Sequence, residues 1–413
     1  MTGIDIPLAE SLGFDSVRLA QIMPVLRERY VDPGIFPHAQ ILVSRKGQVV
    51  LSATTGVARE DGTPLADDSL FRMASMTKPI TSVAFMMLVE EGRVGLDDPV
   101  HTVIPELQGI GVFAGGGGDT PFVTRPTDAP MRMIDLLRHT SGLTYGFQDQ
   151  GELSKASRAL GLDNYRPQMT SDAFVAALAS VPLLFSPGTE WHYSLSTDLL
   201  GVVIERLSGT TLEAFFADRL FGPLAMADSF FQLPEDRADR MTDAWGMEPE
   251  RGRLLFDRGE KSRWRMPDRF YSGGSGLLSC TADYHRFCRM MLGRGALDGV
   301  RLLSPETVAL MTRNHLPGGG DLTQVPRSKF SEPTNAGIGF GLGFAVTMDP
   351  AQAGLPGTPG EFYWDGLFST SFFIDPAEEL ICLFMTQVMP SFDFSVRRDV
   401  KTLVYSALTE TYL

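Results

Sequence analysis

Short apolar runs with the character of β-strands lie near both ends of the chain. Residues 38–44 and 48–53 are separated by Arg45-Lys46-Gly47, which is typical of a hairpin with glycine at its turn. Residues 371–375 and 380–388 flank a second polar turn and are rich enough in Phe, Ile, Leu and Cys to be buried strands. We therefore predict a sheet to which both ends of the chain contribute.

Two further patterns near the C-terminus concern packing. Glycine alternates with large apolar residues over residues 337–344, so a strand there has one bare face against which another segment packs closely. The last segment carries apolar residues at the spacing of an amphipathic helix: Val396, Val400, Leu403, Val404 and Ala407.

The middle of the chain has the apolar spacing of helices, punctuated by glycine and proline. The predicted helices span residues 77–91, 131–139, 171–179, 197–207, 212–220, 283–292 and 304–311. Residues 115–118 and 317–332 are predicted surface loops, and we find no internal repeat. The simplest architecture is an α+β fold with an antiparallel sheet flanked by helices. Its sheet domain comprises residues 1–90 and 290–413, and a mainly helical insertion, residues 91–289, meets it at the active site.

The composition is that of a globular protein of 413 residues, with 43% hydrophobic and 21% charged residues. The net charge of −14 disfavours nucleic acid and membrane surfaces as partners. Cys280, Cys288 and Cys382 form no C-x-x-C pair, so we expect buried free thiols. The chain shows no secretory leader and no apolar run of ~18 residues, so we expect a soluble, cytoplasmic protein.

Several familiar catalytic and ligand motifs are absent. The chain lacks G-x-S-x-G, H-E-x-x-H and G-x-x-x-x-G-K-[ST], and its histidines show no metal-ligand spacing, so we predict no metal and no cofactor. The G-x-G within residues 337–343 lacks the following helix and acidic residue of a dinucleotide site. We interpret the methionines, such as Met86 and Met87, as adaptable core residues.

One lysine of the six follows a serine at a distance of three, in Ser75-Met76-Thr77-Lys78. This spacing alone carries little weight, but Pro79 and the apolar run at 80–88 predict a buried helix directly after it. Ser75 and Lys78 then share a face of the first turn, where the amine can reach the hydroxyl. The helix N-terminus also favours negative charge on an activated serine. The alternative is a lysine that snorkels to the surface or forms an ion pair.

A second motif precedes the helix predicted at 197–207 and reads Ser186-Pro187-Gly188-Thr189-Glu190-Trp191-His192-Tyr193-Ser194-Leu195-Ser196. With both motifs, the chain resembles the serine hydrolases related to class C β-lactamases and penicillin-binding proteins, and more closely their esterase branch, the family VIII carboxylesterases. The resemblance runs from about Pro37 to Asp375 and implies a serine β-lactamase-like fold, with Ser75, Lys78 and Tyr193 as the catalytic residues. Supporting stretches are residues 136–145, 273–277 and 339–344.

The chain also departs from the β-lactamases of that superfamily. Where those enzymes carry K-T-G on the strand beside the site, this chain has Tyr363-Trp364-Asp365-Gly366-Leu367, and the esterase branch typically has W-x-G. Loss of the lysine removes a cation that would pair with the carboxylate of a β-lactam, whereas Trp364 suits an apolar ester group. Leu195 replaces the asparagine of Y-x-N. Both changes argue against efficient β-lactam hydrolysis.

The resemblance implies that Ser75 attacks an ester carbonyl and that water then hydrolyses the acyl-enzyme. We interpret Tyr193 as the base and later the acid, with Lys78 holding the pair. A phenolate near pH 7 requires the pKa of Tyr193 to fall by about three units, roughly 4 kcal/mol. Exchanged roles remain open, because the two groups titrate together. The backbone N–H groups of Ser75 and Leu367 are expected to form the oxyanion hole.

Trp364, Gly366 and Tyr145 are the expected substrate-binding residues. For Tyr145, a role in the core or in anchoring a loop is equally compatible with the sequence. His139 and His192 are interpreted as structural hydrogen-bonding residues, because lysine and tyrosine already fill the role of base.

The sequence therefore predicts a carboxylesterase that cleaves small-molecule esters of short to medium acyl chains. An acyltransferase would use the same residues, with an alcohol instead of water accepting the acyl group. A weak β-lactamase or D-amino peptidase is a further alternative. A non-catalytic binding protein on the same scaffold would be marked by loss of Ser75, Lys78 or Tyr193, all of which are present. The natural ester and the oligomeric state are not predicted.

Overall fold

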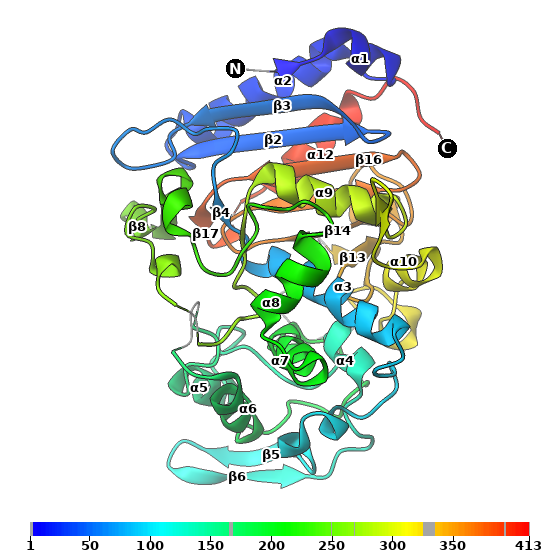
Figure 1. Ribbon diagram of the computed structural model, residues 1–413. Coiled ribbons are helices and arrows are strands. Elements are labelled where there is room, and N and C mark those ends of the chain that lie inside the picture. The colour runs from blue at the N-terminus through cyan, green and yellow to red at the C-terminus, as the bar shows by residue number, and fades with distance from the viewer. Residues whose placement is uncertain are drawn as a thin grey trace.

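The computed structural model describes residues 3–164, 168–248, 250–267, 269–324, 335–391 and 394–412. An eight-stranded antiparallel sheet forms one part of the molecule, in the order β1-β3-β2-β16-β15-β14-β13-β12 (Figure 1). Its strands are β1 (Gly3–Ile4), β2 (His38–Arg45), β3 (Gln48–Gly56), β12 (Ile338–Phe340), β13 (Ala345–Thr347), β14 (Phe362–Asp365), β15 (Ser371–Asp375) and β16 (Leu380–Met385). Both predicted hairpins are present, and β2 pairs with β16 to join the two ends of the chain.

The strand β16 shows why these hairpins are apolar along their whole length. Alternate residues point into the core on one face of the sheet, namely Leu380, Cys382 and Phe384. The intervening residues point into the core on the other face, namely Ile381, Leu383 and Met385. Because both faces are covered, the strand carries no polar alternation.

Helices cover the two faces of the sheet (Figure 1). On one face lie α1 (Ile6–Ser11), α2 (Ser16–Leu26) and α12 (Val396–Ser406), and α2 contacts α12. On the other face α9 (Thr281–Leu292) contacts β15 and β16, and α3 (Thr77–Glu90) packs in the same core. Nearly every residue of α3 is buried, as its all-round apolar sequence predicts.

A mainly helical region continues from α3. Its helices are α4 (Met133–Leu137), α5 (Glu152–Ala159), α6 (Ser171–Ala179), α7 (Ser196–Ser208) and α8 (Leu212–Phe216), which a π-helical turn, Ala217–Phe221, extends. The shorter helices α10 (Pro305–Met311) and α11 (Pro350–Ala353) follow in the C-terminal part. The helix predicted over 131–139 is shorter than expected, because His139 has a φ of 58° and the left-handed region cannot continue a helix.

The four glycines at 115–118 do not form a simple loop, so that prediction was wrong. Three of them lie in β5 (Val112–Gly117), which pairs with β6 (Thr120–Arg125) in an irregular hairpin. Gly117 lies directly against the Glu152 side chain of α5. Of the second predicted loop, 317–319 form a short 3-10 helix, and residues 325–332 lie outside the described part.

The predicted bare face of the glycine-rich segment is present, although the strand is shorter than expected. A Cβ at Gly341 would lie 2.2 Å from the Met311 carbonyl oxygen at the end of α10. A Cβ at Gly343 would lie 2.3 Å from Ser82 Oγ of α3. These glycines therefore let both helices approach the sheet closely, which positions α3 and the lysine on its first turn.

Short strands outside the main sheet were not predicted. The strands β17 (Val388–Met389), β7 (Ala244–Glu248) and β8 (Gly252–Asp257) form a small sheet in that order. Two further pairs are β4 (Phe71–Arg72) with β9 (Leu278–Ser279) and β10 (Ala296–Leu297) with β11 (Val300–Arg301). β4 leads into the turn that carries Ser75, and Ala244 and Met389 of the small sheet pack in one apolar cluster with Ala74.

The cysteines are free and buried, as expected from their number and spacing. Among the described helices, none combines the length and the apolar character needed to cross a bilayer.

Candidate active site

Ser75 lies on a sharp turn between a strand and a helix. The chain leaves β4, passes through a 3-10 helix, Ala74–Met76, and enters α3 at Thr77. Ala74 has a φ of 45°, a left-handed conformation that costs a non-glycine residue about 1–3 kcal/mol. The surrounding packing therefore holds Ser75 in a position that the local chain would not adopt by itself.

Lys78 lies within reach of the serine hydroxyl. Its Nζ is 3.3 Å from Ser75 Oγ and donates to the Gly274 carbonyl oxygen at 2.7 Å. The lysine is 2% exposed, and this burial lowers its pKa to about 8, against the opposing effect of the Asp198 and Asp365 charges. No ion pair within the described residues includes Lys78. A substantial fraction of this amine is therefore neutral near pH 8 and able to accept a proton.

Tyr193 lies beside both Ser75 and Lys78, and the Nζ of Lys78 is 4.7 Å from the centre of the phenol ring. Burial raises the pKa of Tyr193 above its ordinary value, and hydrogen bonding with Ser75 and Trp364 only partly opposes this effect. This direction is opposite to the fall in pKa that a phenolate base near pH 7 requires, because burial disfavours the phenolate. In this arrangement the phenol is the protonated partner and the amine is the better proton acceptor.

Asp198 connects these groups, and sequence reasoning missed it. It is 4% exposed on the first turn of α7. One oxygen accepts hydrogen bonds from the Ser272 hydroxyl and the Gly274 N–H, and the other accepts from the Tyr145 hydroxyl at 3.2 Å. The carbonyl oxygen of Gly274 accepts the hydrogen bond from Lys78, so Asp198 positions the lysine through this turn. The available signal was a carboxylate directly before the apolar run at residues 199–204, five residues after the candidate tyrosine.

Tyr145 lies in the same cluster, as predicted for a residue of the site. Its ring is 5.5 Å from Lys78 Nζ and 5.5 Å from the ring of Tyr193. Burial and the Asp198 charge hold the pKa of its phenol well above the ordinary value. Tyr145 is thus a neutral hydrogen-bond donor that forms one wall beside the lysine.

The segment predicted to form the oxyanion hole lies at the end of β14. A Cβ at Gly366 would lie 2.5 Å from the Met73 carbonyl oxygen, two residues before Ser75, so the strand end and the serine turn are in close contact. Neither the Ser75 nor the Leu367 backbone N–H donates to a protein acceptor in the described part of the chain. Trp364 is 5% exposed, and its ring packs 5.4 Å from that of Tyr193. Trp364 thus supports Tyr193 from the sheet side.

The two histidines near the motifs make structural contacts. The His139 ring is 4.8 Å from that of Tyr193, and its Nδ1 accepts a hydrogen bond from the Ser194 N–H at 3.3 Å. Burial holds the pKa of His139 well below its ordinary value, so the ring is neutral. His192 Nε2 lies 2.8 Å from the Thr144 hydroxyl. Across the described ranges, no group of three or more His, Cys, Asp and Glu side chains could hold a metal ion.

Comparisons with known proteins find similarity along nearly the whole chain. A family model described as Beta-lactamase matches residues 27–406. Esterase EstB of Burkholderia gladioli is 33% identical over 398 residues, which cover 92% of this chain and 93% of that protein. The structure of EstCE1, a hydrolase with promiscuous acyltransferase activity, superposes with a TM-score of 0.78 at 25% identity and covers 96% of this chain and 99% of its own. Unliganded simvastatin synthase from Aspergillus terreus has a TM-score of 0.78 at 25% identity, covering 94% and 98%.

Proposed function

This chain belongs to the Beta-lactamase family, and we propose that it is a family VIII-type carboxylesterase that cleaves small-molecule esters of short to medium acyl chains. The observation that supports this proposal most directly is the pair formed by the half-buried Ser75 and the buried Lys78, with 3.3 Å between Oγ and Nζ. The pKa of that lysine is lowered to about 8 by burial, so the pair combines a nucleophile with a base.

In the proposed mechanism, Lys78 accepts the proton of Ser75 as the serine oxygen attacks the ester carbonyl. The negative charge on the carbonyl oxygen is stabilised by the backbone N–H groups of Ser75 and Leu367. Tyr193 donates its proton to the departing alcohol and recovers one from Lys78, which returns the lysine to its neutral state. Water then attacks the acyl-enzyme, and the same groups act in reverse to release the acid and restore Ser75.

Ester substrates fit this site better than β-lactams. The residue at the strand position of the β-lactamase lysine is Trp364, which is buried against Tyr193, so no cation stands there for a substrate carboxylate. The nearest charge on that strand is Asp365, which forms an ion pair with Arg397 at 2.5 Å. Because Arg397 compensates this charge, Asp365 offers a substrate carboxylate no attraction.

The test is hydrolysis of p-nitrophenyl butyrate by the purified protein, followed by mass spectrometry of the rapidly quenched enzyme. We expect a butyryl group on the peptide that contains Ser75, and no hydrolysis by Ser75→Ala. Ser82→Ala is the matched control, because Ser82 is a buried serine of α3, the helix that directly follows Ser75, and packs against Gly343. Equal activity of Ser75→Ala and the parent would refute the proposal.

A second candidate function is acyl transfer to an alcohol. It is favoured by the similarity to EstCE1 and to simvastatin synthase along nearly the whole chain. Adding a primary alcohol during hydrolysis of p-nitrophenyl butyrate and measuring the ratio of new ester to free acid separates the two functions. A ratio that stays near zero as the alcohol concentration rises identifies a hydrolase.

We further propose that the protein works in a reducing compartment such as the cytoplasm. Its three cysteines are all free and buried, whereas proteins of oxidising compartments commonly pair their cysteines.

A further inference from the structure

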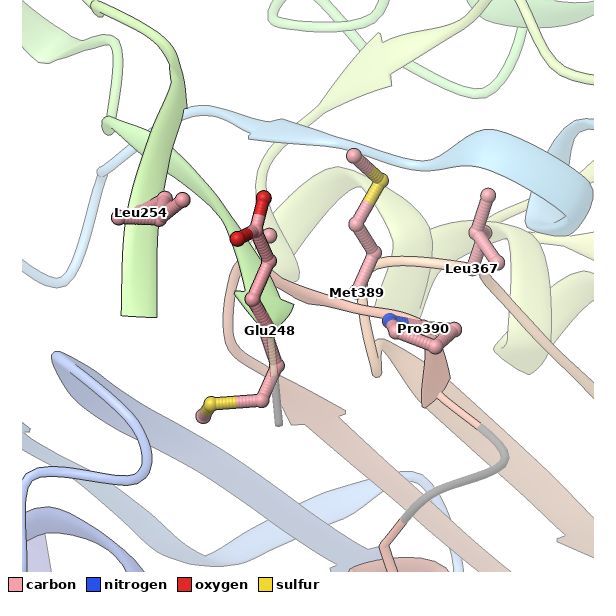
Figure 2. A pocket seen from close by; sticks show the side chains of 7 residues that line it. Glu248, Leu254, Leu367, Met389 and Pro390 are labelled. Carbon is pink, nitrogen blue, oxygen red and sulfur yellow. The ribbon is translucent and has the colours of Figure 1, made fainter. Parts of the chain in front are cut away.

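A hollow of about 250 Å³ adjoins the serine turn. Its walls are the small sheet of β7, β8 and β17 together with the turn after β14 (Figure 2). The lining residues are Gly246, Met247, Glu248, Leu254, Leu367, Met389 and Pro390. Most of these side chains are apolar and only half-buried, so their apolar surface is available to be covered by a ligand.

The hollow begins next to the reacting centre. Leu367 lines it, and the N–H of the same residue is one of the two proposed oxyanion donors. Leu367 and Met389 also pack in one apolar cluster with Ala74, the residue directly before Ser75. In Figure 2, Met389 extends from its strand toward the chain segment that leads into α3. A chain attached to the ester carbonyl therefore reaches the hollow directly past Leu367.

The position of the hollow distinguishes the two halves of an ester. The alcohol oxygen must lie near Tyr193 to receive its proton, and neither Tyr193 nor Lys78 lines the hollow. Leu367 lies on the side of the carbonyl oxygen, and the acyl chain is the remaining substituent. We therefore infer that this hollow is the acyl-binding subsite, which holds an uncharged, apolar acyl chain. This inference rests on the proposed esterase function.

The lining limits the kind of acyl chain. The hollow is smaller than the ~300–1,000 Å³ pockets that bind drug-sized ligands, so it suits a short to medium chain. Its one charged residue is Glu248, which is exposed and forms a 3.4 Å ion pair with Arg251. An apolar chain gains about fourfold in binding per covered methylene, whereas a terminal carboxylate would approach the Glu248 charge.

The test fills the hollow and measures selectivity in two substrate series. The first varies the acyl chain of p-nitrophenyl esters from acetate to octanoate, and the second varies the alcohol of acetate esters from ethyl to octyl. In Met389→Trp we expect the octanoate-to-acetate ratio of kcat/KM to fall at least about tenfold, because the indole occupies the space of the longer chain. The ratio in the alcohol series should change less than about twofold.

A second filling variant and a matched control keep the result interpretable. Leu254→Trp enters from the opposite wall and should give the same selective loss, even if Met389→Trp does not fold. Met348→Trp is the control, because Met348 is an exposed methionine just beyond β13 that does not line the hollow. Thermal melting of each variant identifies any that are unfolded.

The outcomes separate this inference from the proposed function. An unchanged acyl-series ratio in folded filling variants, or an equal or larger change in the alcohol series, overturns the inference while leaving the esterase intact. A parent protein that cleaves no ester in either series refutes the proposed function, and the inference with it.

Discussion

Two buried lysines on opposite sides of the main sheet have different partners. Lys401 of α12 is 7% exposed, and its Nζ lies 2.5 Å from the Glu361 carboxylate. Lys78 of α3 is 2% exposed and contacts a carbonyl oxygen, a serine hydroxyl and two aromatic rings. A buried ammonium with a carboxylate at contact distance keeps its charge compensated, whereas burial without such contact favours the neutral amine.

The difference indicates which of the two buried lysines can be neutral and accept a proton. Glu361 is itself held by the Tyr405 hydroxyl at 2.7 Å, so the Lys401 cluster ties α12 to the edge of β14. The carboxylates of Asp198 and Asp365 act on Lys78 only through space, and they do not offset its burial. The ion pair of Lys401 therefore favours a stabilising role, whereas the lowered pKa of Lys78 favours proton exchange.

The largest expected effect comes from removing each lysine and measuring turnover. Lys78→Met should lower kcat on p-nitrophenyl butyrate by at least about 10³-fold, because serine loses its proton acceptor. Lys401→Met should change kcat less than about threefold at a temperature where it is folded, because its side chain lies on the other side of the sheet. Comparable losses in the two variants would contradict the division of roles.

The second prediction concerns stability. Lys401→Met should lower the free energy of unfolding by about 3–5 kcal/mol, because it leaves the Glu361 carboxylate buried without a cation. Burial raises the pKa of Glu361 in the folded state. The difference in free energy of unfolding between the variant and the parent should therefore shrink as the pH falls and the carboxyl group becomes protonated. Urea unfolding at several pH values measures both effects. The double variant Lys401→Met/Glu361→Gln should recover part of the loss, and no recovery would argue against the charge as its cause.

The third prediction sharpens the electrostatic part of the comparison. The parent kcat/KM should rise with pH and level off above about 8, since the neutral form of Lys78 is the active one. Asp198→Asn removes a charge that raises the pKa of Lys78, so the midpoint should move to lower pH, by up to about one unit. A pH–rate profile tests this, with Asp349→Asn as the control, because Asp349 is a half-buried carboxylate that caps α11 and is not among the charges that act on Lys78. An unmoved or raised midpoint would exclude Lys78 as the titrating base.

The smallest expected effect is that of Tyr405→Phe. Its hydroxyl contacts Glu361 and Asp375, so loss of the hydroxyl should lower the free energy of unfolding by about 1–2 kcal/mol. The pH midpoint of kcat/KM should stay at the parental value, because the cluster does not face Lys78. A shifted midpoint would show that the two lysine sites are electrostatically coupled.

Much of the fold was predictable because it depends on local patterns of apolar and turn residues. The terminal hairpins follow from apolar runs around Lys46-Gly47 and around residues 376–379, and α3 follows from Pro79 and the apolar run after it. The strands β7, β8 and β17 escaped prediction because they are short and only partly buried. β7 and β8 form a local hairpin, whereas β17 joins them from more than a hundred residues further along the chain.

The sequence by itself determined the chemical groups of the candidate site: a serine three residues before a lysine at the head of a buried helix, and a tyrosine before a second helix. Only the tertiary structure decided how these groups titrate. The pKa of Lys78 depends on its burial, beside Tyr145 and Tyr193, and on the opposing charges of Asp198 and Asp365, all of which come from distant segments. Desolvation and electrostatic effects act through space, so no local pattern of residues could have revealed that burial lowers the pKa of the amine and raises that of the phenol.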